Sequence, residues 1–268
     1  MALYRVVVLQ HAELEGLGTF GPLLQQECGL DLLEAFAGEE AYRRRVEALL
    51  PDPGIDALVV MGGPQSAAEL GRHPVLEHSL RLLRRAVRED LPVLGVCLGA
   101  QLLALALGGR VWAGRTRGKG PEVGWQALRL TPRGSVDPAF HSFAEIDPAF
   151  HWHWDSFDLP PRAWRLAETA SYPNQAFRWG RWAYGLQFHL EVTGLMVSNL
   201  VDGNADRLAG LRRVDPDMMV ARAARCAPLL LPKATTMIDF FLECVRRRAQ
   251  ERETGPSYSG REGVRPRA

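Results

Sequence analysis

Short apolar runs alternate with amphipathic segments along the first part of the chain. The runs have the length and composition of buried strands, and the segments between them repeat their apolar positions with the period of a helix. The expected strands are residues 4–10, 30–36, 55–63 and 91–96, and the expected helices are residues 20–29, 39–50, 73–90 and 98–109. Because strands alternate with helices, we expect right-handed crossovers and a parallel sheet with helices on both faces.

The pattern changes after Gly109. Residues 110–134 and 162–193 are rich in Gly, Val and Trp, which predicts antiparallel strands at the edge of the sheet. Helical periodicity returns after Gly194 and is clearest over residues 233–250. The sequence therefore predicts an α/β fold with a doubly wound, mostly parallel sheet, flanking helices and antiparallel edge strands.

No Pro- or Gly-rich linker divides this pattern, so we expect residues 1–250 to form one domain. Residues 251–268 contain few apolar side chains, and we expect a disordered tail there. No apolar run reaches 18 residues, and the first strand begins without a leader-like segment, so we expect a cytoplasmic protein with no membrane span. The net charge of +1 does not favour a nucleic-acid or membrane partner.

The four cysteines show no paired spacing, which argues against both a zinc site and a disulfide framework. Cys28, Cys226 and Cys244 fall in helix-like segments and are interpreted as structural. Cys97 is different, because it stands between an apolar strand and an apolar helix in the sequence "GVCLG".

The setting of Cys97 allows two interpretations. It is either a small buried apolar residue or the nucleophile of a tight strand-to-helix turn, in which Gly95 and Gly99 provide the required small neighbours. The N-terminus of the following helix would favour the thiolate. The pattern favours the nucleophile.

A cysteine nucleophile needs a histidine base, and that base is commonly oriented by an acid. His189 and Glu191 have the two-residue spacing that puts both side chains on one side of a strand, although a purely structural pair would have the same spacing. His151 and His153 share this spacing, but two histidines without a third ligand make a weak metal site, and no metal is predicted. The remaining histidines are expected to be solvated or capping; they are His11, His73, His78 and His141.

Three segments, "MGGPQS", "GVCLGAQ" and "GLQFHLE", occur in an order that resembles the class I glutamine amidotransferases. The segments "HWHWDSFDLP" and "NQAF" are similar to those of stand-alone members related to the amidotransferase domain of GMP synthase. The resemblance covers residue 4 to about residue 200 and implies a flavodoxin-like fold without a cofactor.

The resemblance also implies a role for each matching residue. Cys97 would attack the side-chain amide of glutamine to give a thioester and ammonia, with His189 as base and Glu191 as its orienting acid. The backbone N–H groups of Gly63 and Leu98 would hold the oxyanion. The amino-acid end of the substrate would be bound by Gln101, Trp154 and Asp155. The ammonia would go to an unidentified acceptor or to a partner synthetase.

The chain departs from the family pattern at two positions. Leu190 stands where the family has proline, and Trp154 stands where it has glycine. The first change leaves the His–Glu spacing intact, whereas the second could narrow the substrate pocket. Two alternatives therefore stay open: a hydrolase of γ-glutamyl peptides or conjugates, and a regulatory subunit without turnover.

Overall fold

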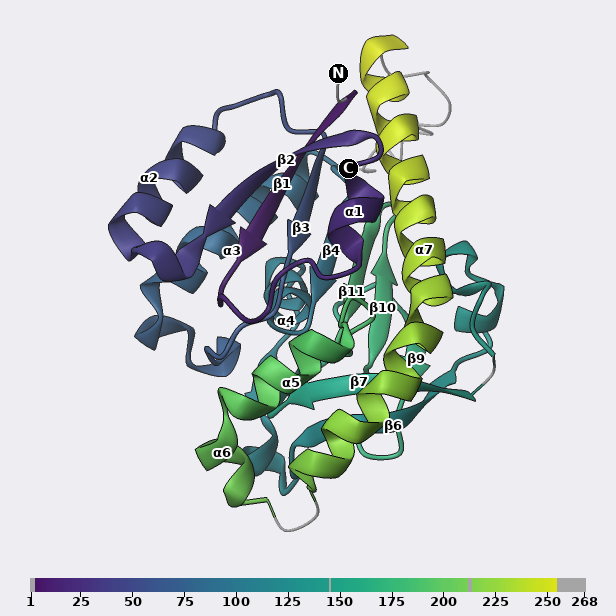
Figure 1. The fold of residues 1–268 in the computed structure, drawn as a ribbon. Helices are drawn as coiled ribbons and strands as arrows, with labels where there is room; N and C mark the ends of the chain where they lie inside the picture. Colours follow the sequence, from purple (N-terminus) through teal and green to yellow (C-terminus); the bar gives the residue numbers. More distant parts are fainter. Residues whose placement is uncertain (1–2, 145, 212–213, 255–268) are drawn as a thin grey trace, which may run out of the picture.

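The computed structural model describes residues 3–144, 146–211 and 214–254. Its centre is a nine-stranded sheet in the order β2-β1-β3-β4-β11-β10-β9-β6-β7, and β5 and β8 form a separate antiparallel pair (Figure 1). The strands are β1 (Tyr4–Gln10), β2 (Cys28–Glu34), β3 (Ala57–Val60), β4 (Val93–Val96), β5 (Val111–Ala113), β6 (Glu122–Leu130), β7 (Ile146–His153), β8 (Asp155–Phe157), β9 (Trp164–Glu168), β10 (Ala176–Trp179) and β11 (Ala183–Leu186).

The sheet has a parallel half and an antiparallel half. Strands β2, β1, β3, β4 and β11 are mutually parallel, and β10, β9, β6 and β7 continue the sheet in antiparallel pairs. This arrangement confirms the predicted mostly parallel sheet with antiparallel strands toward one edge. The predicted place of residues 183–186 was wrong, because β11 lies inside the sheet and pairs in parallel with β4. Each of its residues is buried, as a central strand requires.

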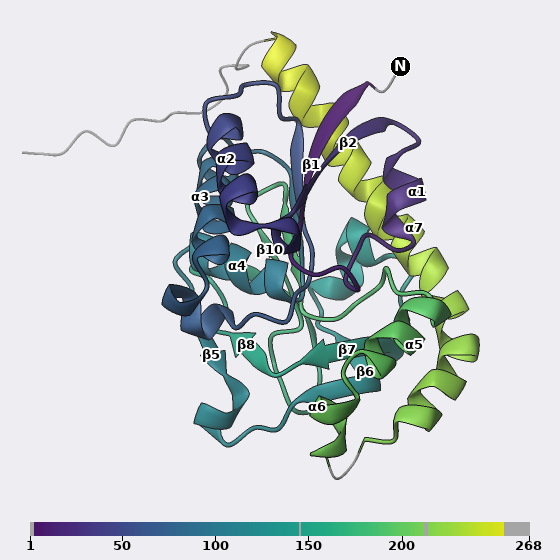
Figure 2. The same cartoon turned by 60° about the vertical axis from the view of Figure 1, so that its left-hand side comes forward.

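Helices cover both faces of the sheet (Figure 2). They are α1 (Phe20–Leu24), α2 (Glu39–Leu49), α3 (Pro74–Arg88), α4 (Leu98–Ala106), α5 (Gly194–Asp202), α6 (Ala205–Ala209) and α7 (Pro216–Thr254). Helices α2, α3 and α4 pack together over one apolar core, and α1, α5 and α7 pack over the other. No helix in the described part of the chain combines the length and apolar character needed to cross a bilayer.

The helix predicted over residues 20–29 is shorter than expected. It ends at Leu24, and Cys28 opens β2, where it pairs with Tyr4 of β1. The interpretation of Cys28 as a helix residue was therefore wrong. A ladder of parallel hydrogen bonds with β1 outweighs the local helical pattern in this segment.

Helix α7 is much longer than the predicted segment over residues 233–250. The sequence pattern breaks at Pro228 and Pro232, whereas the helix runs through both prolines. It also continues to Thr254, four residues past the expected end of the domain, and Arg252 forms an ion pair with Asp56 there (2.9 Å). The rest of the predicted tail, residues 255–268, lies outside the described residues.

The packing of α7 yields a stability prediction. Phe241 is 2% exposed in the core beneath α7, so Phe241→Ala should lower the free energy of unfolding by about 3–5 kcal/mol. Leu229 on the same helix is 55% exposed, and Leu229→Ala should change stability by less than about 0.5 kcal/mol. Urea unfolding of both variants checks this. Equal losses would mean that α7 does not seal the core.

Candidate active site

Cys97 occupies a one-residue turn between β4 and α4. Its backbone has φ 51° and ψ −106°, a strained conformation for any residue with a side chain. A Cβ on Gly95 would lie 2.6 Å from the carbonyl oxygen of Gly99, and a Cβ on Gly99 would collide with the carbonyl of Val60. The two glycines therefore permit the close approach of strand and helix that holds the thiol at the end of the sheet.

The thiol of Cys97 is nearly enclosed. The residue is 4% exposed, and its Sγ lies 3.6 Å from the carbonyl oxygen of Trp152 and 3.7 Å from Nε2 of Gln187. Burial raises the pKa of the thiol, and the hydrogen bond and charge of His189 act in the opposite direction. The reactivity of this cysteine thus depends on its histidine neighbour.

His189 and Glu191 form a buried ion pair just beyond the end of β11. The Nδ1 of His189 lies 2.7 Å from Oε1 of Glu191, and each side chain is 1% exposed. The backbone N–H of His189 donates to the carbonyl of Phe150 (2.8 Å), and this isolated bridge ties the segment to β7 after β11 has ended at Leu186. Burial alone would lower the pKa of His189, but the charge of Glu191 and the interactions with Cys97 outweigh it and hold this pKa well above the usual value.

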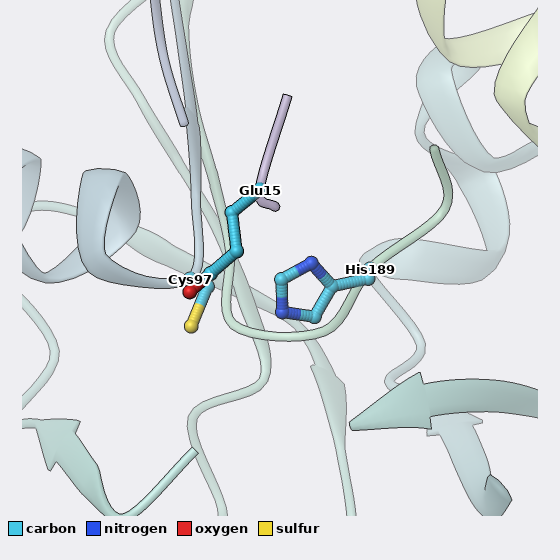
Figure 3. A group of neighbouring side chains, drawn as sticks. All are labelled: Glu15, Cys97 and His189. Atoms are coloured by element: carbon cyan, nitrogen blue, oxygen red, sulfur yellow. The ribbon is translucent and has the colours of Figure 1, made fainter. Parts of the chain in front are cut away.

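The structure brings the predicted Cys97, His189 and Glu191 together at the carboxyl ends of β4 and β11, and Glu15 lies beside them. The Sγ of Cys97, a ring nitrogen of His189 and a carboxylate oxygen of Glu15 lie within 4.8 Å of one another (Figure 3). Because Nδ1 of His189 is bonded to Glu191, the ring nitrogen available to the thiol is Nε2. This arrangement can pass a proton between a thiol and a bound substrate.

The sequence analysis did not single out Glu15. This residue follows β1 by five positions, at the sheet end where open α/β sheets place their ligand sites. An acidic residue in the loop after the first strand was the available signal, but the groups around it, His189, Glu191 and Arg207, come from distant segments and were not visible in the sequence.

The site opens into a cavity of about 410 Å³. Its lining includes all five residues predicted for the oxyanion and the substrate, namely Gly63, Leu98, Gln101, Trp154 and Asp155. Leu98 is the first residue of α4, where backbone N–H groups lack partners within the helix. Gln101 is 3% exposed, and its amide already donates to the carbonyl of Asp155 and to Oε1 of Gln187 (both 3.2 Å).

Trp154 forms one wall of the cavity together with a residue that the sequence analysis missed. The guanidinium carbon of Arg207, on α6, lies 3.5 Å from the centre of the Trp154 ring. Burial lowers the pKa of Arg207, and the charges of Glu15, Asp155 and Cys97 raise it. Trp154, which departs from the family pattern, therefore has the positively charged side chain of Arg207 over its ring at the cavity wall.

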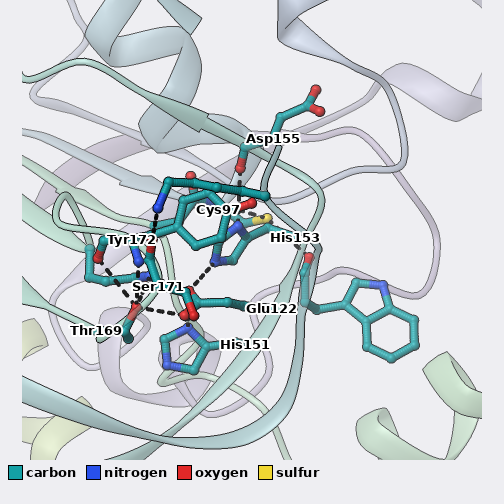
Figure 4. Close-up of polar contacts among 12 residues, drawn as sticks. Cys97, Glu122, His151, His153, Asp155, Thr169, Ser171 and Tyr172 are labelled. Atoms are coloured by element: carbon teal, nitrogen blue, oxygen red, sulfur yellow. Dashed lines mark hydrogen bonds and ion pairs between the residues drawn. The ribbon is translucent and has the colours of Figure 1, made fainter. Parts of the chain in front are cut away.

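A buried polar cluster is centred on Glu122 and His153 (Figure 4). Both ring nitrogens of His153 have polar neighbours: Nδ1 lies 3.0 Å from the carbonyl oxygen of Asp155, and Nε2 lies 3.1 Å from Oε2 of Glu122. Glu122 also accepts from Thr169 (2.6 Å) and Gln175 (2.5 Å). The cluster fastens the turn that contains Trp154 and Asp155 to strands β6 and β7.

Glu122, His151 and His153 could in principle hold a metal, since their ligand atoms lie within 4.8 Å of one another. Both oxygens of Glu122 are already occupied by hydrogen bonds, which favours a hydrogen-bond network. Burial lowers the pKa of His151 to about 3. The expectation of no metal stays a prediction.

The expected setting of His11 was wrong. The residue is 1% exposed rather than solvated, and its Nε2 lies 2.9 Å from Oγ of Ser79. Burial lowers its pKa to about 4, so its ring is neutral near pH 7. Packing of α3 against the end of β1 buries this position, which sequence periodicity alone did not reveal.

The fold and the site together define the class of protein. A family model described as glutamine amidotransferase class-I matches residues 40–196, and the chain belongs to this family. It is 34% identical to the glutamine amidotransferase-like protein YfeJ of Salmonella typhimurium over 61% of this chain and 68% of that protein. It is 37% identical to the GMP synthase of Thermus thermophilus over 59% of this chain, but this alignment spans only 29% of the synthase.

Solved structures support the same assignment. A glutamine amidotransferase from Thermotoga maritima superposes with a TM-score of 0.77 at 30% identity, covering 91% of this chain and 100% of that one. A glutamine amidotransferase from Methylobacillus flagellatus gives a TM-score of 0.73 at 26% identity, covering 91% and 96%. The confirmed fold therefore extends well beyond the segment matched by the family model.

The environment of Cys97 predicts how its thiol reacts. Removing the imidazole in His189→Ala should raise the thiol pKa and slow alkylation of Cys97 by iodoacetamide at pH 8 by about tenfold or more. Peptide mapping separates Cys97 from Cys28 and Cys244, whose pKa values burial raises to about 11 and about 12. His141→Ala, at an exposed site, is the control. An unchanged rate in His189→Ala would disprove the coupling.

Proposed function

We propose that this protein hydrolyses the side-chain amide of glutamine through a cysteine thioester and releases ammonia. The observation that carries the proposal is the cluster of Cys97, His189 and Glu191, of which Cys97 lines the cavity, in a member of the class I glutamine amidotransferase family. Each of the three has the chemistry that its role requires.

The proposed reaction begins when His189 accepts the thiol proton and Sγ of Cys97 attacks the amide carbon. Glu191 stabilises the resulting imidazolium across a 2.7 Å contact. The N–H groups of Gly63 and Leu98 stabilise the oxyanion, and each such donor typically lowers the barrier by about 3 kcal/mol. His189 then protonates the leaving nitrogen, ammonia departs, and water hydrolyses the thioester to glutamate.

The ammonia acceptor is proposed to be a separate synthetase or another acceptor outside this chain. The GMP synthase relatives are named as glutamine-hydrolysing enzymes, and this chain aligns with less than a third of the Thermus enzyme. A transferase role would therefore depend on a partner that activates the acceptor.

Hydrolysis of a larger γ-glutamyl compound is the second candidate. The Trp154–Arg207 wall favours it, because an aromatic ring and a guanidinium group offer contacts that glutamine itself does not need. A regulatory subunit without turnover is less well supported, since the cysteine and the paired histidine and glutamate are all present and close together.

Cys97→Ala tests the proposed function. Ammonia release from glutamine should fall to the background rate, because the mutant has no nucleophile for the thioester. The small side-chain change should cost on the order of 1 kcal/mol of stability, which thermal unfolding checks. Ammonia release at the parent rate would disprove the assignment of Cys97.

Trp154→Gly tests which substrate the cavity accepts. If the ring crowds glutamine, the variant should lower the KM for glutamine by about 2- to 12-fold, the effect of roughly 0.5–1.5 kcal/mol of aromatic contact. If the ring binds a larger γ-glutamyl compound, the KM for that compound should rise instead. Trp154→Ala controls for the added backbone freedom of glycine. Identical kinetics in parent and variants would mean that the ring does not touch substrate.

A further inference from the structure

Glu15 places a carboxyl group at the reaction centre without belonging to the proposed triad. The residue is 6% exposed, and its Oε2 has no hydrogen-bond partner among the described residues. A Cβ on Gly62 would collide with this oxygen and would lie 3.5 Å from Cε1 of His189. The glycine therefore leaves the space that this carboxyl group fills.

The loop that carries Glu15 is anchored at both ends. At its start, Nε2 of Gln10 donates to the carbonyl oxygens of Ala12 (2.9 Å) and Glu13 (3.3 Å). At its end, the N–H of Thr19 donates to the backbone carbonyl of Glu191 (2.9 Å). The loop is thus docked on the segment that supplies the proposed acid, and the carboxyl position is a built feature of the site.

The groups around Glu15 shift its pKa in opposite directions. Burial raises the pKa of Glu15 to about 7, with a further upward effect from Glu191. His189 and Arg207 lower this pKa, and the backbone N–H of Gly63 also favours the charged form. Glu15 in turn raises the pKa of the Cys97 thiol. A buried carboxyl group with an unpartnered oxygen costs stability, which is a common sign of function.

The geometry limits what this carboxyl group can contact. In the proposed reaction, the leaving nitrogen must approach His189 Nε2 within hydrogen-bond distance, and the reacting carbon must approach Sγ of Cys97. A Glu15 oxygen lies within 4.8 Å of Sγ of Cys97 and of a ring nitrogen of His189. The nearest substrate group with hydrogens to donate to a carboxylate is the leaving nitrogen.

We propose that Glu15 is a specificity-determining residue that accepts a hydrogen bond from the leaving nitrogen, and so favours amides that release ammonia over those that release a bulky, weakly basic amine. This inference rests on the proposed function. The Sγ–C bond forms, the C–N bond breaks, and His189 delivers to nitrogen the proton that it took from the thiol. Glu15 transfers no proton; it stabilises the positive charge that develops on nitrogen.

The test compares two substrates with the same glutamyl end, L-glutamine and γ-L-glutamyl-p-nitroanilide. Glu15→Gln should lower kcat/KM for glutamine at pH 8 by about 10- to 100-fold, the size expected for a lost hydrogen bond to a charged group. The anilide should change by less than about threefold, because aniline nitrogen is weakly basic and carries little positive charge. Glu77→Gln, at an exposed site on α3, makes the same charge change and should leave both values unaltered.

The pH profile gives a second readout. Glu15 accepts the hydrogen bond best when ionised, so kcat/KM of the parent for glutamine should rise with pH through about 7. That rise should be absent in Glu15→Gln, whereas the contributions of Cys97 and His189 remain. Thermal unfolding shows whether the variant is folded. If Glu15→Gln is not folded, Glu15→Asp replaces it, because this variant keeps the charge but withdraws it by one methylene. Glu15→Asp should lower kcat/KM for glutamine more than for the anilide, but by a smaller factor than expected for Glu15→Gln.

The possible outcomes separate the two proposals. Equal losses on both substrates, with an unchanged pH profile, would reduce Glu15 to a structural residue and leave the proposed function intact. Faster glutamine turnover in Glu15→Gln would mean that the carboxyl group blocks the oxyanion site, and would also overturn the inference. A parent protein that turns over neither substrate would overturn the proposed function, and the role of Glu15 with it.

Discussion

The close approach of β4 to α4 at Cys97 is the constraint on which the rest of the site depends. A strand buried on both faces has to become a helix within one residue, and the two flanking glycines allow this because neither has a Cβ. The resulting φ of 51° at Cys97 is strained, and the hydrogen bond from its N–H to Leu186 of β11 (2.7 Å) helps to hold it. That bond also brings the end of β11, and therefore His189, next to the thiol.

Burial then determines how the site behaves electrostatically. The thiol, the imidazole and both nearby carboxyl groups are almost fully removed from solvent, so each charge depends on its neighbours. Glu191 raises the pKa of His189, whereas Glu15 opposes formation of the thiolate. The buried cluster around Glu122 fastens the segment that contains Trp154. The pocket is therefore preorganised before any substrate enters.

Much of this arrangement could be predicted from the sequence, because local pattern carries it. The strand periods and the glycines around Cys97 each encode a local geometry. His189 and Glu191 lie beyond the end of β11 instead of on a strand, and the bridge of His189 to Phe150 ties them to β7. The remainder depends on contacts between distant segments. Glu15 and Arg207 reach the cavity from the β1–α1 loop and from α6, and neither segment has a distinctive pattern. Likewise, pairing with β1 places Cys28 in a strand, and packing against α3 buries His11.

The central claim is that Cys97 forms the covalent bond to a glutamine-like substrate. Incubation with a diazoketone analogue of glutamine, followed by peptide mapping, tests it directly. The account predicts one label per chain on the peptide that contains Cys97, with loss of ammonia release in proportion to labelling. A label on Cys28, Cys226 or Cys244, or full turnover after stoichiometric labelling of Cys97, would contradict it.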